Sequence, residues 1–102
     1  MAITAKITHM VSDEKSKIRA FAQVTVDDQF TVCGVKVVEG QTDTFVSMPS
    51  FQSRDENNNP RYVDIFRIHS RDMREAVSTA VLGAYEIAVQ QRENQEYEPV
   101  FQ

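Results

Sequence analysis

The chain has 102 residues, 41% of them hydrophobic and 25% charged, and its net charge is −4. These values are ordinary for one soluble globular domain, and no apolar run is long enough for a membrane span or a secretory signal. The single cysteine, Cys33, excludes an internal disulfide. Its place in an apolar run predicts a buried, reduced thiol in a cytoplasmic protein.

Apolar and polar residues alternate through the first half of the chain, which is the pattern of half-buried β-strands. The alternating runs cover residues 3–8, 18–26, 30–38 and 44–48. Asp27-Asp28 separates the second run from the third and predicts a tight hairpin, although the turn lacks the glycine of the strongest hairpin signals. Cys33-Gly34 interrupts the third run and predicts a β-bulge.

The middle of the chain is more polar. Pro49 ends the fourth run, and residues 50–60 have the composition of a mobile loop. Residues 61–68 then return to strand composition, which predicts a fifth strand.

A different period begins near residue 70, where apolar residues recur with the i, i+3, i+4 spacing of an amphipathic helix. The helix should run from about Arg71 to about Gln91, with Ser70 as its N-cap and Asp72 near the positive end of its dipole. Its predicted core-facing stripe consists of Met73, Ala76, Val77, Ala80, Val81, Ala84, Ile87 and Ala88.

A second apolar strip is expected on the same helix. Leu82 and Val89 should point away from the core-facing stripe, and Tyr85 should lie at its edge. Such a strip is typical of a contact with a partner chain, and scattered surface hydrophobic residues are the equally open alternative.

Together these elements predict an α+β fold, in which an antiparallel sheet of about five strands is followed by a C-terminal amphipathic helix. Residues 1–92 should form a single domain. Residues 93–102 contain Glu93, Glu96 and Glu98 but no basic residue, and they predict an acidic tail that frays.

Five sequence fragments follow one another in a specific order. They are VDDQF at residues 26–30, VKVVEG at 35–40, FVSMPS at 45–50, Asp64-Ile65, and Ala80-Val81-Leu82 with Tyr85. They resemble, in order, the patterns D-x-E-F, K/R-V-I-E/D-G, F-V-A-M-P-S, R-D-I and A-V-L-x-x-Y of the stage V sporulation protein G (SpoVG, septation protein) family. The resemblance covers about residues 3–88.

This resemblance implies a small mixed fold that assembles as a homodimer. It also implies a regulatory role in bacterial septation and sporulation, exerted partly through direct binding of DNA or RNA, with no catalytic activity and no cofactor. Family members usually carry two basic residues directly after M-P-S, where this chain has Phe51 and Gln52. Val63 likewise replaces the arginine of R-D-I, and residues 66–69 replace the family's A-H-P-I.

Basic residues gather around the polar segment and the start of the helix. Five arginines lie within 21 residues, at Arg54, Arg61, Arg67, Arg71 and Arg74. Arginine suits phosphate because its planar fork donates two parallel hydrogen bonds, and Phe51 and Tyr62 could stack on exposed bases. The alternative is a solvated surface of mixed charge, because four acidic residues are interleaved with these arginines: Asp55, Glu56, Asp64 and Asp72.

No pattern for other chemistry is present in the sequence. His9 and His69 are far apart and have no metal-ligand spacing with Cys33, and no nucleophile or phosphate-loop motif occurs. We therefore expect no metal, no enzymatic activity, no small-molecule substrate and no membrane association. The two function hypotheses are a dimeric nucleic-acid-binding regulator and a protein-interaction module acting through the sheet edge or the strip of Leu82, Tyr85 and Val89.

Overall fold

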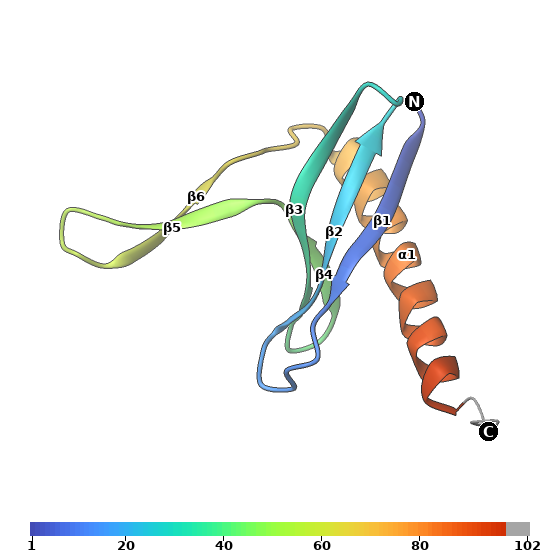
Figure 1. Cartoon of the computed structure of the whole chain (residues 1–102). Helices are drawn as coiled ribbons and strands as arrows, with labels where there is room; N and C mark the ends of the chain where they lie inside the picture. The colour runs from blue at the N-terminus through green and yellow to red at the C-terminus, as the bar shows by residue number, and fades with distance from the viewer. Residues whose placement is uncertain (98–102) are drawn as a thin grey trace.

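A computed structural model describes the backbone of residues 1–97 and the side chains of residues 1–92. The elements follow in the order β1 (Ile3–Met10), β2 (Ile18–Val26), β3 (Phe30–Glu39), β4 (Thr44–Ser47), β5 (Ser50–Arg54), β6 (Pro60–Asp64) and α1 (Arg71–Tyr97). Antiparallel strands followed by one helix confirm the α+β class (Figure 1).

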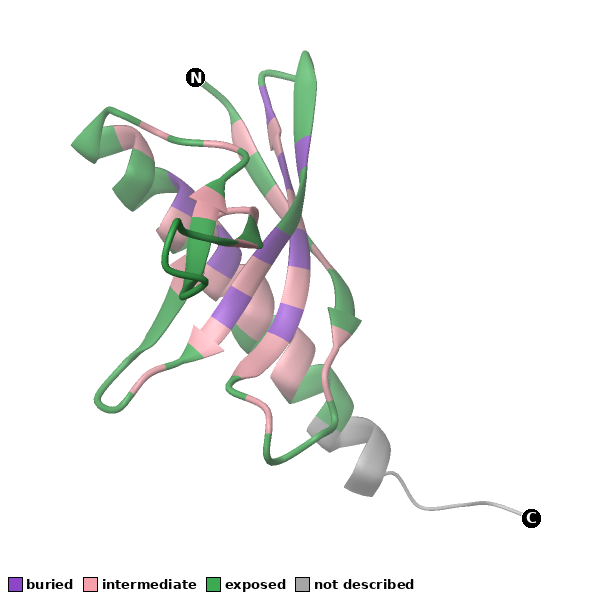
Figure 2. Ribbon diagram, turned by 90° about the vertical axis from the view of Figure 1, so that its left-hand side faces the viewer, coloured by how far each residue is buried: buried purple, intermediate pink, exposed green. Residues whose placement is uncertain are grey.

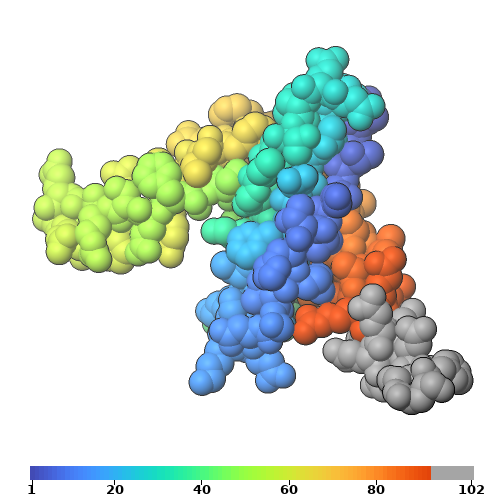
Figure 3. Space-filling view, viewed as in Figure 1, coloured from blue at the N-terminus to red at the C-terminus, as the bar shows by residue number. Residues whose placement is uncertain are grey.

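The strands form two sheets rather than one sheet of about five strands. One sheet has the order β1-β2-β3-β4, and the other is a separate ribbon of β5 and β6. In the figures this ribbon, which we call the arm, projects away from the four-stranded sheet (Figures 1 and 3). The arm spans residues 50–64 and packs on no other strand or helix of the described chain.

The predicted hairpin and bulge are both confirmed. Asp27 and Asp28 have φ angles of 51° and 55°, and the Gln29 amide donates to the carbonyl of Val26 at 2.9 Å, which closes a tight turn. Positive φ at both central positions matches the twist of the flanking strands. In β3, Cys33 and Gly34 stand between the partners of Ala22 and Val24, and Gly34 takes a φ of 76°.

Cys33 is exposed, so the prediction of a buried thiol is wrong. The bulge is the physical reason. Val32 and Val35 both face the core, and Cys33 and Gly34 between them stand opposite the single residue Gln23, so β3 carries one extra residue there. Cys33 therefore lies on the outer face of the sheet.

Small aliphatic side chains make up the core between the sheet and α1 (Figure 2). Strict alternation along β2 buries Ala20, Ala22, Val24 and Val26 against the helix, as the sequence predicts. Strand β3 and the helix supply the rest: Val32, Val35, Val37, Val77 and Val81. No polar residue is buried in the described part of the chain.

The segment predicted as a mobile loop is a β-hairpin, which corrects that prediction. Asp55 organises its turn, because its Oδ1 accepts hydrogen bonds from the amides of Asn57 and Asn59, each at 2.9 Å. At the other end the Ile65 amide donates to the Pro49 carbonyl at 2.9 Å. The predicted strand over residues 61–68 is correspondingly shorter and ends at Asp64.

Helix α1 begins where the sequence predicts. The Ser70 hydroxyl oxygen accepts from the Met73 amide at 3.2 Å, which confirms the N-cap. The helix extends to Tyr97, six residues beyond the expected end near Gln91. The predicted frayed tail at 93–102 lies mostly outside the described residues and stays a prediction. Within the described residues, α1 does not combine the length and apolar character that are needed to cross a membrane.

The core-facing side of α1 is rotated from the predicted stripe. Met73, Val77 and Val81 face the sheet as expected, but Ala76 is exposed and Ile87 is 58% exposed. Leu82 and Tyr85 pack against the core instead, and the apolar area that they bury there contributes to holding this side of α1 on the sheet.

Candidate nucleic-acid interface

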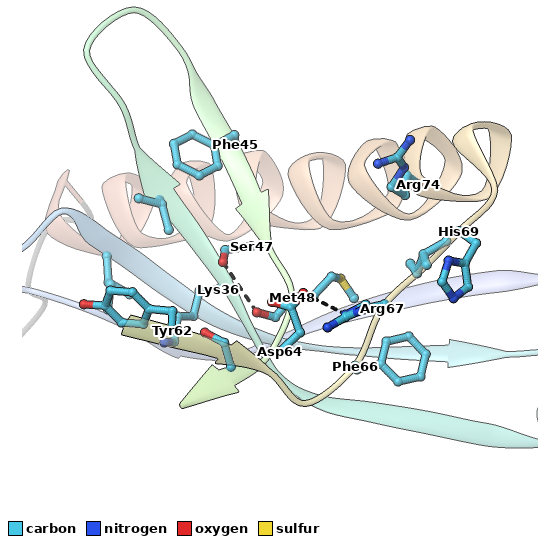
Figure 4. A pocket seen from close by; sticks show the side chains of 14 residues that line it. Lys36, Phe45, Ser47, Met48, Tyr62, Asp64, Phe66, Arg67, His69 and Arg74 are labelled. Carbon is cyan, nitrogen blue, oxygen red and sulfur yellow. Dashed lines mark hydrogen bonds and ion pairs between the residues drawn. The ribbon is translucent and has the colours of Figure 1, made fainter. Parts of the chain in front are cut away.

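A groove of about 800 Å³ lies in the angle between the outer face of the four-stranded sheet and the arm. Side chains from several strands, from the segment after the arm and from α1 line it (Figure 4). They include Lys36 of β3, Phe45 of β4, Tyr62 and Asp64 of β6, Arg67 and His69 of the segment after the arm, and Arg74 of α1. We call this surface the groove.

The pairing of the strands determines which side chains of the sheet line the groove. Lys36 lies between Val35 and Val37, which are fully buried, so alternation turns Lys36 to the outer face. Lys36 pairs with Ser47 of β4, and Val38 pairs with Phe45, which sets the ring of Phe45 on the same outer face. The arm contributes Tyr62 and Asp64, which share one face of the ribbon because they are two residues apart.

The groove is electropositive although the whole chain is acidic. It is lined by three basic side chains, Lys36, Arg67 and Arg74, and by one acidic side chain, Asp64. Asp64 Oδ2 lies 3.1 Å from Arg67 Nε, and both side chains are more than half exposed. Ion pairs of this kind contribute little to stability, so Arg67 can exchange its partner at small cost.

Two exposed aromatic rings line the same groove. Tyr62 is 73% exposed and Phe45 is 48% exposed. Figure 4 shows Phe45, Lys36 and Tyr62 toward one end of the groove, with Arg67, His69 and Arg74 toward the other. The surface thus has exposed aromatic side chains toward one end and guanidinium groups toward the other.

The structure divides the predicted cluster of arginines. Arg67, Arg74 and Tyr62 line the groove, while Arg71 Nε is 3.2 Å from Glu75 Oε1 outside it. Arg54 lies at the end of β5, where its Nη1 donates to the Asn58 carbonyl at 2.9 Å.

The remaining two predicted residues lie on the other face of the arm. Phe51 pairs with Val63, and Arg61 pairs with Ser53, so both are one residue out of step with Tyr62. That any of these residues contacts nucleic acid stays a prediction.

Sequence reasoning missed Lys36 and Phe45 and considered His69 only as a metal ligand. The alternation of β3 already predicts that Lys36 points outward. No local signal could place it beside β4 and the arm, because that proximity depends on pairing between distant segments. Among the described residues, no group of three or more His, Cys, Asp or Glu side chains could hold a metal ion.

The predicted partner-facing strip on α1 is placed differently. Leu82 packs against the core, so the prediction that it points away from the core-facing stripe is wrong, and Tyr85, expected at the edge of that stripe, packs there as well. That these residues contact a partner chain stays a prediction. Val89 is half-buried and lines a small cleft with Tyr85 and Met10 of β1. The core of alanines and valines leaves room at the sheet surface, and these larger side chains occupy it.

Comparison with known proteins identifies the family. The SpoVG family model matches residues 1–87. A relative from Archaeoglobus fulgidus, named "Putative septation protein SpoVG", is 36% identical over 84% of this chain and 96% of its own length. Relatives of the same name from Clostridium beijerinckii and Heliobacterium modesticaldum are 36% and 43% identical over 87% and 74% of this chain, and 92% and 80% of their own lengths. The chain therefore belongs to the SpoVG family.

Proposed function

We propose that this protein is a regulator linked to septation and sporulation that acts by binding DNA or RNA directly through the groove. The names of its relatives support the link to septation. The observation that carries the proposed binding is the concentration of positive charge in a concave surface of an otherwise acidic chain. Clefts lined by one sign of charge attract oppositely charged ligands even when the net charge of the molecule is unfavourable.

The phosphate contacts are assigned to Lys36, Arg67 and Arg74. Among the described residues, neither the Lys36 ammonium nor the Arg74 guanidinium makes an ion pair, so both are available to a ligand. Arg71 is the matched control because it lies one helical turn from Arg74 and outside the groove.

The test is fluorescence anisotropy of labelled DNA and RNA oligomers at about 50 mM and about 200 mM salt. We expect binding that weakens with salt, and Arg74→Gln should weaken it and lower the slope of log K against log salt by about 0.7–0.9. Arg71→Gln should leave both quantities close to those of the parent protein. Binding that ignores salt, or equal effects of the two substitutions, would contradict the groove as the contact surface.

We also infer that the protein acts as a homodimer in which the arm contributes to the interface. Phe51 and Ile65 are 52% and 63% exposed, and both edges of the two-stranded arm are unpaired in the described chain. Exposed strand edges and apolar side chains are usually covered by another chain. Light scattering should then give about twice the 11.6 kDa mass of the chain. A dimer that binds no nucleic acid would favour the protein-interaction alternative.

A further inference from the structure

We infer that the groove takes an unpaired strand of DNA or RNA rather than a duplex. This inference rests on the nucleic-acid binding proposed above and specifies the form of the ligand. The side chains of Tyr62 and Phe45 line the groove and are largely exposed, and the basic residues Lys36, Arg67 and Arg74 line the same groove.

The aromatic side chains of the groove favour an unpaired strand over a duplex as the ligand. In a duplex the faces of the bases are stacked on one another, and only base edges and phosphates are presented to a protein. An unpaired strand presents base faces, which stack on aromatic rings whatever the sequence. The exposed rings of Tyr62 and Phe45 therefore add nothing to phosphate contacts with a duplex but match the faces of splayed bases.

Helix α1 is poorly suited to read a duplex. Its sheet-facing side is held by the burial of Val77 and Val81, so the helix is not free to leave the sheet. Between Arg74 and Arg92 it carries Glu75 and Glu86 and no basic residue. A helix that enters the major groove needs cations toward the phosphates on either side, and here the exposed charges in that stretch are negative.

The arm is the other element with the shape of a duplex reader, because a two-stranded ribbon can enter the major groove. Its tip, however, carries Asp55 and Glu56. Asp55 is held there by its hydrogen bonds to the turn, and the neighbouring Arg54 is turned onto the Asn58 carbonyl. Inserting such a tip between two phosphate backbones would bring like charges together.

Stacking contacts and phosphate contacts would lie toward opposite ends of the groove. Tyr62 and Phe45 lie toward one end with Lys36, and Arg67 and Arg74 lie toward the other (Figure 4). A strand running along the groove could stack bases at the aromatic end and pass its phosphates to the guanidinium groups. Arg67 would exchange Asp64 for a phosphate, which costs little for an exposed pair.

The experiment compares single strands with duplexes of the same sequence. Labelled DNA and RNA oligomers of about 12 nucleotides, single-stranded and annealed, are titrated with the full chain at about 50 mM salt. We expect the single strands to bind at least about tenfold more tightly than the duplexes, and the DNA and RNA arms show which sugar is preferred. Tyr62→Ala should weaken single-strand binding by about 5- to 150-fold.

Matched variants separate stacking from other effects. Tyr62→Phe keeps the ring and should bind like the parent protein. Phe30→Ala removes an exposed ring at the start of β3, outside the groove and the arm, and should have no effect on binding. Because Tyr62 is mostly exposed, Tyr62→Ala should unfold at the parent temperature, which excludes misfolding as the cause.

Three outcomes overturn the inference. If duplexes bind as tightly as single strands and Tyr62→Ala has no effect, the single-strand inference fails while the proposed nucleic-acid binding stands. If single strands are preferred but neither Tyr62→Ala nor Phe45→Ala weakens them, stacking in this groove is wrong. If no oligomer binds at the lower salt concentration, both the inference and the proposed function fail.

Discussion

Two glycines show how the same substitution should have opposite effects at different backbone positions. Gly34 lies in the bulge of β3 with a φ of 76°, a conformation that costs other residues about 1 kcal/mol. A Cβ there would meet only Pro49 Cβ at 3.7 Å, so backbone strain rather than crowding sets the cost. Gly83 lies inside α1, where alanine is favoured over glycine by about 1 kcal/mol, and a Cβ there meets nothing within 4 Å.

We expect Gly34→Ala to lower the melting temperature and Gly83→Ala to raise it. Each change should be about 4–8 °C, the shift that about 1 kcal/mol produces in a domain of this size. Differential scanning calorimetry measures both variants directly. Gly34→Asn is the internal control and should cost less than Gly34→Ala, because asparagine tolerates positive φ better. Equal shifts for alanine and asparagine would argue against backbone strain.

The bulge also shows what single residues reveal before a structure is known. The broken alternation at Cys33-Gly34 was sufficient to predict a bulge, and the structure confirms it. The orientation of Cys33 was predicted wrongly, because an apolar run indicates burial only while the two-residue period continues. Once a bulge shifts the register, the face taken by each residue depends on the partner strand.

At the scale of elements, the arm should be separable from the body of the protein. Asp55→Ala removes the acceptor of two turn hydrogen bonds, from the amides of Asn57 and Asn59. We expect hydrogen exchange in β5 and β6 to accelerate at least about fivefold, the factor that about 1 kcal/mol produces. The melting temperature should stay within about 2 °C, because no arm residue belongs to the core.

Asn57→Ala is the matched control for this prediction. Asn57 contributes its backbone amide to the turn, which alanine retains, so exchange in the arm should not change. A fall in melting temperature with Asp55→Ala comparable to that of a core substitution would contradict the independence of the arm.

The arm was also the element that sequence reasoning described least well. Its strands have no buried face, so Ser50, Gln52 and Arg54 follow one another without the alternation that identifies β2. Polar composition then predicts a loop. Helix α1 had a clear period and a confirmed N-cap, but its rotation depended on which side chains fill the sheet surface, which the period alone does not specify.

At the scale of the molecule, the groove could not be predicted because it is made by distant segments. The cluster from Arg54 to Arg74 was visible in the sequence, yet only Arg67 and Arg74 of its five arginines line the groove. Lys36 and Phe45 join them through the pairing of β3 with β4 and the return of the chain after the arm. The α+β class could be predicted from local sequence patterns. Predicting the site would have required knowing how distant segments pair.

The overall shape is the reason to expect a dimer. The radius of gyration is 16.0 Å, larger than the roughly 13 Å of a compact domain of 100 residues. The projecting arm (Figure 3) accounts for part of this excess, and its apolar residue Phe51 is exposed in a monomer. If a second copy covers the arm, removing the arm should remove the dimer without unfolding the body.

The register of the arm allows this removal to be made cleanly. Ser50 and Asp64 are cross-strand partners, so residues 51–63 can be replaced by Asn-Gly, a two-residue turn suited to a hairpin. We expect the shortened chain to unfold cooperatively near the parent temperature, to sediment as a monomer where the parent is a dimer, and to lose nucleic-acid binding with Tyr62. A shortened chain that remains a dimer would place the interface on the sheet edge or on α1, since those are the surfaces that the replacement leaves intact.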